Sequence, residues 1–219
     1  PPESLRAFPL SCGRGTHPVA WQSQLHGCTG LGRASVRQCA LCAVRWVSGM
    51  SALQAPNKLQ RSLMRLDEAP AFMRGFVQNI ILRRAVPFTG TAGVKFVSLT
   101  PERVEVHLAN EHRVQNHIGG VHASAMNLLA ETATGMVVGM NVRDDCLPLA
   151  KELSMAFKKR ATGGLKAVAT LTAEQRAAMQ ASDKGEVQVA VTVTDEAGVE
   201  PVECVFTWAW VPSSRPPKN

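Results

Sequence analysis

The stretch 116-NHIGGVHASAMNLLAETATGMVVGM-140 decides the fold of this chain. From Ala123 onward helix-forming residues dominate it, and apolar side chains recur on one side at positions such as Leu129, Ala133 and Val137. Alanine and glycine crowd the same stretch. A helix that is apolar on most sides and rich in small residues is one around which a sheet can wrap closely. The stretch therefore predicts a central, buried helix.

Apolar and polar residues alternate on both sides of this helix, as they do in β-strands. Two alternating segments precede the helix and four follow it, and Asp195-Glu196-Ala197-Gly198 has the composition of a hairpin turn. His107 alternates with Val106 and Leu108, so we expect it to face solvent. The predicted strands cover residues 94–97, 104–108, 149–157, 165–171, 187–194 and 202–210. This order predicts an α+β domain, in which one long helix lies against a curved antiparallel sheet.

A helical pattern comes before the first predicted strand. Leucine, phenylalanine and isoleucine recur at spacings of three and four between residues 59 and 80, and Pro70 divides the pattern into two short helices. We interpret this stripe as core or dimer packing, because its polar face is too weakly basic to favour the alternative of a membrane-surface helix. We expect an N-terminal helical segment at residues 50–90, the sheet domain at 91–211 and a frayed, proline-rich tail at 212–219.

Residues 1–49 differ from the rest of the chain in composition. They contain five arginines, no lysine and the single acid Glu3, and they show no sustained periodicity. This composition is typical of an organellar transit peptide and predicts a mitochondrial location. Alternatively, Met50 is the initiator and the protein is cytoplasmic. We exclude this predicted leader from the fold prediction in either case.

Charge, hydropathy and cysteine use exclude several classes of protein. The net charge is +7, but no basic stripe interleaved with aromatic residues suggests a nucleic-acid surface. No apolar run reaches the roughly 18–20 residues of a membrane-spanning helix. Cys39 and Cys42 have zinc-knuckle spacing without a second close pair, so we expect no metal site. Only Cys146 and Cys204 lie in the body of the chain, which favours a reducing compartment over a disulfide-stapled domain.

The start of the predicted helix combines features that suit acyl transfer. Gly119 and Gly120 permit a tight turn and a close backbone approach. Ala123 follows at the helix N-terminus, where backbone N–H groups lack partners and the helix dipole is positive. Glu131 lies little more than two turns further on, in apolar surroundings where a carboxylate is costly to bury unless it is partnered or used. These residues are the strongest candidates for chemistry.

The same residues resemble the signature of hotdog-fold acyl-CoA thioesterases of the phenylacetyl-CoA and 4-hydroxybenzoyl-CoA type. In that signature an Asn precedes a His by six residues and an acid follows the His by nine, as Asn116, His122 and Glu131 do here. Residues 157–167, with an aromatic, then basic residues, then Ala-x-Gly, resemble the strand-loop-strand of that family. Residues 187–210 resemble its closing hairpin. The resemblance covers residues 90–210 and implies the hotdog fold.

The resemblance also implies roles for particular residues. The Ala123 N–H would polarise the thioester carbonyl, and Glu131 would act as general base or as nucleophile. Asn116 would orient the water or the carboxylate, while His122 would support the helix start by packing or hydrogen bonding. In the family these groups meet across a dimer interface, so a homodimer or homotetramer is implied, with no cofactor. The residues implied to bind the acyl-CoA substrate are Gly120, Lys158, Lys159, Arg160 and Gly163; the basic loop among them is alternatively a solvated surface.

The chain departs from the family signature at two positions, where Ala123 and Ser124 replace a pair of glycines. Their side chains occupy space near the expected path of the pantetheine arm, which favours an alternative: a non-catalytic hotdog module that binds acyl-CoA or lipid. A hotdog hydratase ranks last, because Glu111-His112 lacks the continuation that such enzymes have. A serine or cysteine hydrolase is disfavoured, since neither Ser124 nor Cys146 lies beside an evident base.

Overall fold

The computed structural model describes residues 55–66, 68 and 70–213. These residues belong to one compact unit of the chain. The predicted leader at 1–49 and residues 214–219 of the predicted tail lie outside the described residues.

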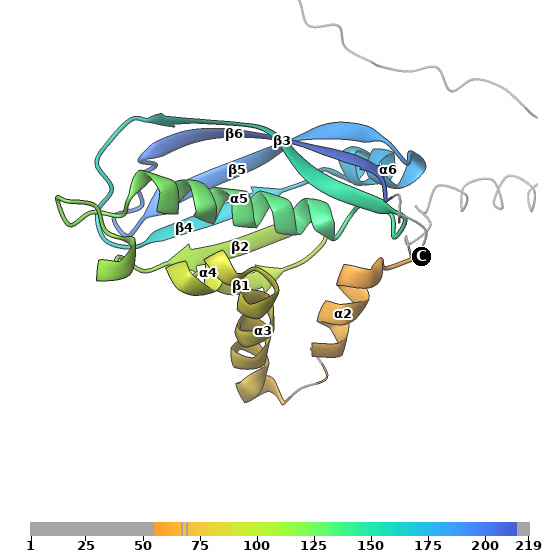
Figure 1. The fold of residues 1–219 in the computed structure, drawn as a ribbon, viewed down its shortest axis with the longest axis horizontal. Helices are drawn as coiled ribbons and strands as arrows, with labels where there is room; N and C mark the ends of the chain where they lie inside the picture. The colour runs from red at the N-terminus through yellow and green to blue at the C-terminus, as the bar shows by residue number, and fades with distance from the viewer. Residues whose placement is uncertain (1–54, 67, 69, 214–219) are drawn as a thin grey trace, which may run out of the picture. The chain divides into compact units, whose positions relative to one another are not determined.

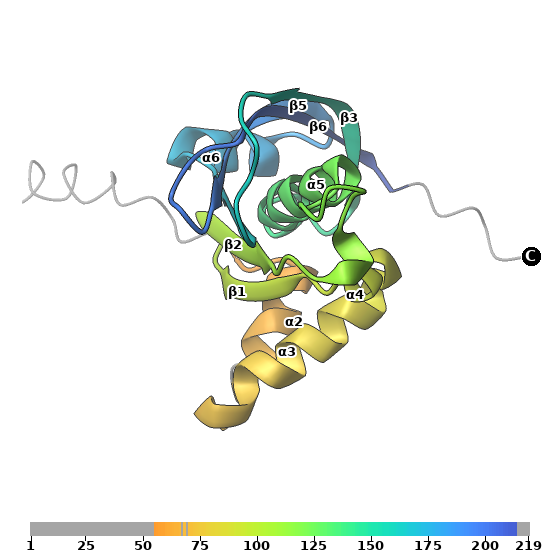
Figure 2. The same cartoon turned by 90° about the vertical axis from the view of Figure 1, so that its left-hand side faces the viewer.

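The described chain is an α+β domain, as the sequence predicts. Helix α5 (Ala123–Gly139) lies inside the curve of one antiparallel sheet, which wraps around it (Figures 1 and 2). The strand order is β1-β2-β4-β5-β6-β3, so α5 connects β2 to the strand at the far edge of the sheet. The strands are β1 (Lys95–Leu99), β2 (Arg103–Leu108), β3 (Cys146–Phe157), β4 (Leu165–Thr170), β5 (Gly185–Asp195) and β6 (Val202–Pro212).

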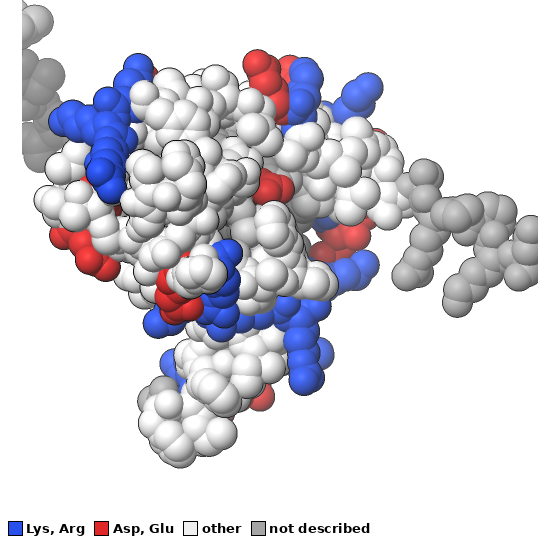
Figure 3. Space-filling model, turned by 60° about the vertical axis from the view of Figure 1, so that its left-hand side comes forward, with Lys and Arg blue, Asp and Glu red and all other residues white. Residues whose placement is uncertain are grey.

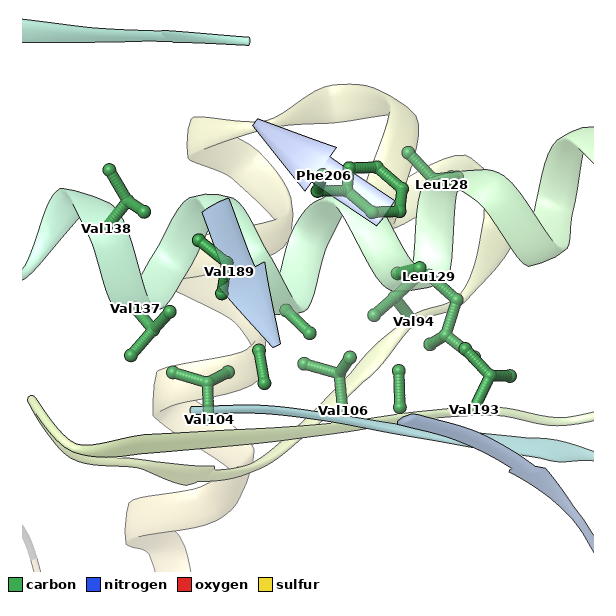
Figure 4. Packing of buried hydrophobic residues seen from close by; sticks show 14 of the residues in the cluster. Val94, Val104, Val106, Leu128, Leu129, Val137, Val138, Val189, Val193 and Phe206 are labelled. Carbon is green, nitrogen blue, oxygen red and sulfur yellow. The ribbon is translucent and has the colours of Figure 1, made fainter. Parts of the chain in front are cut away.

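The core lies between α5 and the concave face of the sheet (Figure 4). Leu129 and Val137 of the helix are fully buried, and they meet valines of β2 and β5 such as Val106. Burying each such side chain stabilises the fold by about 1.5–3 kcal/mol. Ala130 and Ala133 are also fully buried, and their small side chains let the strands approach the helix closely. The small-residue pattern of the sequence therefore has the packing role that we predicted.

The N-terminal segment forms three helices: α2 (Lys58–Leu66), α3 (Ala71–Ala85) and α4 (Pro87–Ala92). The division at Pro70 is as predicted. Two short helices were predicted in this segment; the third, α4, starts at Pro87, at a position where the missing N–H of proline costs nothing. The helix ends at Gly93, whose φ of 79° is a left-handed C-cap.

A short helix also interrupts the four strands predicted after α5. Helix α6 (Ala173–Ala181) lies between β4 and β5, where the sequence analysis expected a strand-to-strand connection. The Thr172 hydroxyl oxygen accepts a hydrogen bond from the Gln175 backbone N–H, and the Gln175 side-chain oxygen accepts one from the Thr172 backbone N–H. This reciprocal capping box starts the helix.

The two edges of the sheet have different surroundings. At the β1 edge, the Asn79 side chain of α3 accepts a hydrogen bond from the Phe96 N–H (2.8 Å) and donates one to the Phe96 carbonyl (3.0 Å). At the β3 edge, almost every side chain is exposed, including Leu153 and Phe157. One edge is therefore covered by a helix, and the other is left with open backbone groups and apolar side chains.

Candidate active site

Asn116 closes the loop that precedes α5. Its side-chain oxygen accepts hydrogen bonds from the N–H groups of Ile118 and Gly120, both at 3.1 Å. The Asn116 backbone N–H donates a hydrogen bond to the Gly120 carbonyl at 2.8 Å. Gly119 has a φ of 74°, a backbone conformation that favours glycine. The Asn116 oxygen is thus committed to the turn. Within one chain, Asn116 and Gly120 line neither of the cavities that Glu131 lines.

His122 is the N-cap of α5. Its Nδ1 accepts a hydrogen bond from the Ser124 N–H at 3.1 Å, so the ring supports the helix start in the way that the sequence analysis assigned to it. The Ala123 N–H, one residue into the helix, has no acceptor within residues 55–66, 68 and 70–213. The helix dipole adds partial positive charge at this N–H. A backbone donor is therefore available for an oxygen that gains negative charge.

Glu131 lies on the face of α5 that the sheet leaves open. The carboxylate is half-buried, and no hydrogen bond or ion pair engages it in the described part of the chain. Burial raises the pKa of Glu131, and no neighbouring cation opposes the shift. A carboxylate with this environment is a candidate general base or nucleophile.

Glu131 and Leu128 line two cavities that lie along the open face of α5. The larger has a volume of about 460 Å³ and reaches from Glu131 to the N-terminus of the helix, where Ala123 and Ser124 line it. Phe88 of α4 and three residues of β3 (Leu153, Met155, Phe157) complete its walls. The smaller, of about 230 Å³, runs from Glu131 toward Met136 and is covered by α3 and α4.

Ala123 and Glu131 share the larger cavity but stand far apart within one chain. Eight residues separate them, which corresponds to about 12 Å along the helix axis. One thioester carbonyl is too small to contact both groups of the same helix. A second helix that runs antiparallel to the first would bring its Glu131 to the first helix's Ala123.

The basic loop after β3, residues 158–160, lines neither of the two cavities that Glu131 lines within one chain. Lys158 forms an ion pair with Glu203 at 2.8 Å, and an Arg160 nitrogen donates to the Ile118 carbonyl at 3.3 Å. Lys159 is held by its backbone N–H, which donates to the Pro201 carbonyl. Arg160 thus links this loop to the turn before α5. Gly163 takes a φ of 69° under the Glu196 side chain, so a structural requirement explains this glycine.

Sequence reasoning missed several residues that line the cavities. Asn127 lies midway between Ala123 and Glu131 on the same helix face, a position that its spacing of four from each could have revealed. Phe88, Leu82 and Trp208 come from α4, α3 and β6. No local pattern in the sequence indicates that these three residues meet α5.

Among residues 55–66, 68 and 70–213, no group of three or more His, Cys, Asp or Glu side chains could hold a metal ion. None of the helices that the structure describes is long and apolar enough to span a bilayer. Figure 3 shows a face on which acidic and basic side chains both lie around an area of uncharged ones.

Comparison with solved structures identifies the fold. A Pseudomonas aeruginosa protein of unknown function, described as a probable thioesterase, matches at 23% identity and a TM-score of 0.57, over 62% of this chain and 94% of that one. A protein from Shewanella oneidensis, provisionally described as a thioesterase, matches at 13% identity and a TM-score of 0.53, over 61% and 94%. A mutant thioesterase from P. aeruginosa matches at 16% identity and a TM-score of 0.50, over 62% and 92%. No curated protein matches.

These matches and the strand order define the chain as a hotdog-fold protein, which confirms the fold expected from the sequence. Within this fold, residues 76–211 match the profile of the family described as Domain of unknown function (DUF4442). The chain belongs to that family.

Proposed function

We propose that this protein hydrolyses acyl-CoA thioesters to a carboxylic acid and coenzyme A. The observation that carries the proposal is the Glu131 carboxylate, which is half-buried, unpaired in the described chain and exposed to a cavity that ends at the Ala123 amide. Water enters as the second substrate, and Glu131 either removes its proton or attacks the carbonyl first. The description of several fold relatives as thioesterases supports the same reaction class.

The proposed active unit is a homodimer with antiparallel α5 helices. The separation of about 12 Å between Ala123 and Glu131 supports this arrangement, because a two-fold axis would pair each acid with the other chain's amide. The open β3 edge, with the exposed Leu149 and Leu153, supports the same interface. We further propose that, in this dimer, the Lys158–Arg160 loop and Asn116 of one chain approach the other chain's cavity.

A non-catalytic acyl-CoA binding module is the second candidate. The observation that favours it is that the Ala123 and Ser124 side chains line the larger cavity, where the related signature has glycines. Both candidates bind acyl-CoA, but only the thioesterase hydrolyses it.

Thiol release from a series of acyl-CoA thioesters tests the proposal. We expect turnover by the full chain, a loss of about 10²–10⁴-fold in Glu131→Gln, and wild-type rates in the exposed control Glu200→Gln. Saturable acyl-CoA binding without turnover would establish the binding module instead. Equal rates in wild type and Glu131→Gln would remove Glu131 from the mechanism.

The proposed location is mitochondrial. It rests on the arginine-rich, acid-poor composition of residues 1–49, which lie outside the described residues. A fusion of residues 1–49 to a fluorescent protein should localise to mitochondria; a diffuse cytoplasmic signal would favour translation from Met50.

A further inference from the structure

The smaller cavity beside Glu131 has mostly apolar walls. Apart from Glu131, its side-chain polar groups are two hydroxyls and one indole N–H. The Thr132 hydroxyl donates to the Leu128 carbonyl at 2.6 Å, and the Thr89 hydroxyl donates to the Val86 carbonyl at 2.7 Å. The remaining walls are apolar side chains of α3, α4, β1 and α5. An apolar group is therefore the occupant that this cavity fits.

Trp208 lines this cavity together with Gly135, which lies one helical turn past Glu131. Its Nε1 donates to the Thr134 hydroxyl at 3.1 Å, and that hydroxyl in turn donates to the Ala130 carbonyl at 3.0 Å. The outer edge of the indole lies against Gly135, where an added Cβ would stand only 2.8 Å from the ring. Trp208 and Gly135 thus form a fixed floor, with no gap between them.

The floor lies a short and definite distance from the reacting acid. Gly135 is four residues from Glu131, which corresponds to about 6 Å along the helix. About five extended carbon–carbon bonds cover that length. The larger cavity, in contrast, is lined by the polar Asn127 midway along the helix and by Ser124 at the helix N-terminus, and it suits the amide-rich arm of coenzyme A.

We propose that the smaller cavity is the acyl pocket, that it takes an apolar acyl group of about six carbons, and that Trp208 and Gly135 set this length. This inference rests on the proposed function. The acyl group enters past Glu131 and ends against the indole, while the thioester and the pantetheine arm lie toward the helix N-terminus. Trp208 and Gly135 are specificity-determining residues that contact the end of the chain and take no part in the reaction.

Two substitutions should change the length preference in opposite directions. Gly135→Ala pushes the indole into the pocket, so the preferred chain should shorten. Trp208→Phe removes the part of the ring that lies on Gly135, so the preferred chain should lengthen; Thr134 keeps its bond to the Ala130 carbonyl. Each methylene gained or lost should change affinity about fourfold. Gly139→Ala, whose new Cβ meets only Leu59 at 3.2 Å, is the matched control.

The measurement is the affinity of the full chain for non-hydrolysable acyl-CoA thioethers from butyryl to palmitoyl, alongside turnover of the matching thioesters. The wild type and Gly139→Ala should bind hexanoyl analogues most tightly. Gly135→Ala should bind a shorter analogue most tightly, and Trp208→Phe a longer one. If the variants lose affinity equally at all chain lengths, or if all four proteins prefer the same chain length, the inference is overturned, while the proposed hydrolysis is not. Displaced affinities without turnover would support the pocket and overturn hydrolysis. Failure to bind any analogue would overturn both.

Discussion

At the scale of single residues, Glu131 is a stability cost that its proposed role in hydrolysis would explain. Burial raises its pKa, so the folded protein favours the protonated form more than the unfolded chain does. The protonated Glu131 therefore favours the folded state. This contribution to stability is complete below the ordinary Glu pKa of about 4.3, and it is lost as the pH rises through the raised pKa of Glu131 in the folded protein. At neutral pH the ionised carboxylate therefore destabilises the fold. Active sites commonly carry such costs.

The Glu131→Gln variant should be more thermostable than the wild type at neutral pH. The difference in unfolding midpoint should be small near pH 4 and should grow as the pH passes the raised pKa of Glu131. Thermal unfolding at several pH values, with Glu200→Gln as control, measures this. A difference that does not depend on pH would show that the folded Glu131 carboxyl has the pKa of a solvated group.

The Ala123 N–H can be removed without breaking the helix. Ala123 is the first residue of α5, where proline is tolerated, and His122 has φ −66° and ψ 143°, a conformation that suits the residue before proline. Ala123→Pro should keep the fold and lower kcat by about 10²–10³-fold, the cost of one oxyanion donor. Circular dichroism checks the fold, and thiol release checks the rate. An unchanged kcat would exclude this N–H as the donor.

At the scale of elements, side-chain hydrogen bonds to backbone groups fix the N-terminal helices on the sheet. Asn79 satisfies both backbone groups of Phe96, as a neighbouring strand would. The buried Asn57 donates to the Gly139 and Val142 carbonyls and joins α2 to the end of α5. Asn79 thus holds α3, which lines the smaller cavity at Glu131, on the edge of the sheet.

Asn79→Ala should destabilise the protein by about 1–3 kcal/mol, because it leaves the Phe96 N–H and carbonyl without their partner. Gln78→Ala, the neighbouring substitution on α3, is the control and should be close to neutral. Urea unfolding measures both. If Asn79→Ala and Gln78→Ala have the same stability, water satisfies the β1 edge equally well and Asn79 does not hold α3 on the sheet.

The sequence predicts those elements whose patterns are long and regular. The small-residue run of α5 and the strict alternation around His107, which lies partly exposed beside Glu105, both correspond to the structure. The short helices α4 and α6 depend on single capping residues such as Gly93 and Thr172, which a search for periodicity overlooks. Glu131 could be found because a lone acid in an apolar helix is costly. The residues of the cavity walls could not be found in this way, because residues such as Trp208 come close to Glu131 only in the tertiary fold.

At the scale of the whole molecule, the asymmetry between the two sheet edges points to a partner at β3. The β1 edge is covered by α3, while Leu147, Leu149 and Leu153 of β3 are each about half exposed. A strand with open backbone groups and apolar side chains pairs readily with a second copy of itself.

Leu149→Lys should convert the proposed dimer to a monomer, since a lysine on an edge strand opposes pairing. Leu149 is not among the residues that line either cavity at Glu131. Val97→Lys, at an exposed apolar residue of β1, is the control and should leave the assembly unchanged. Sedimentation velocity measures the assembly state. A dimeric Leu149→Lys protein would place the interface elsewhere.

Subunit mixing tests most directly whether two copies share each active site. Glu131→Gln and Ala123→Pro should each be nearly inactive alone. When the two variants exchange subunits, half of the dimers are mixed and each mixed dimer holds one intact acid opposite one intact amide. Thiol release should then recover to about one quarter of the wild-type rate. If thiol release by the mixture stays as slow as it is for each variant alone, Glu131 and the Ala123 N–H do not act across the interface, and the proposed site is wrong.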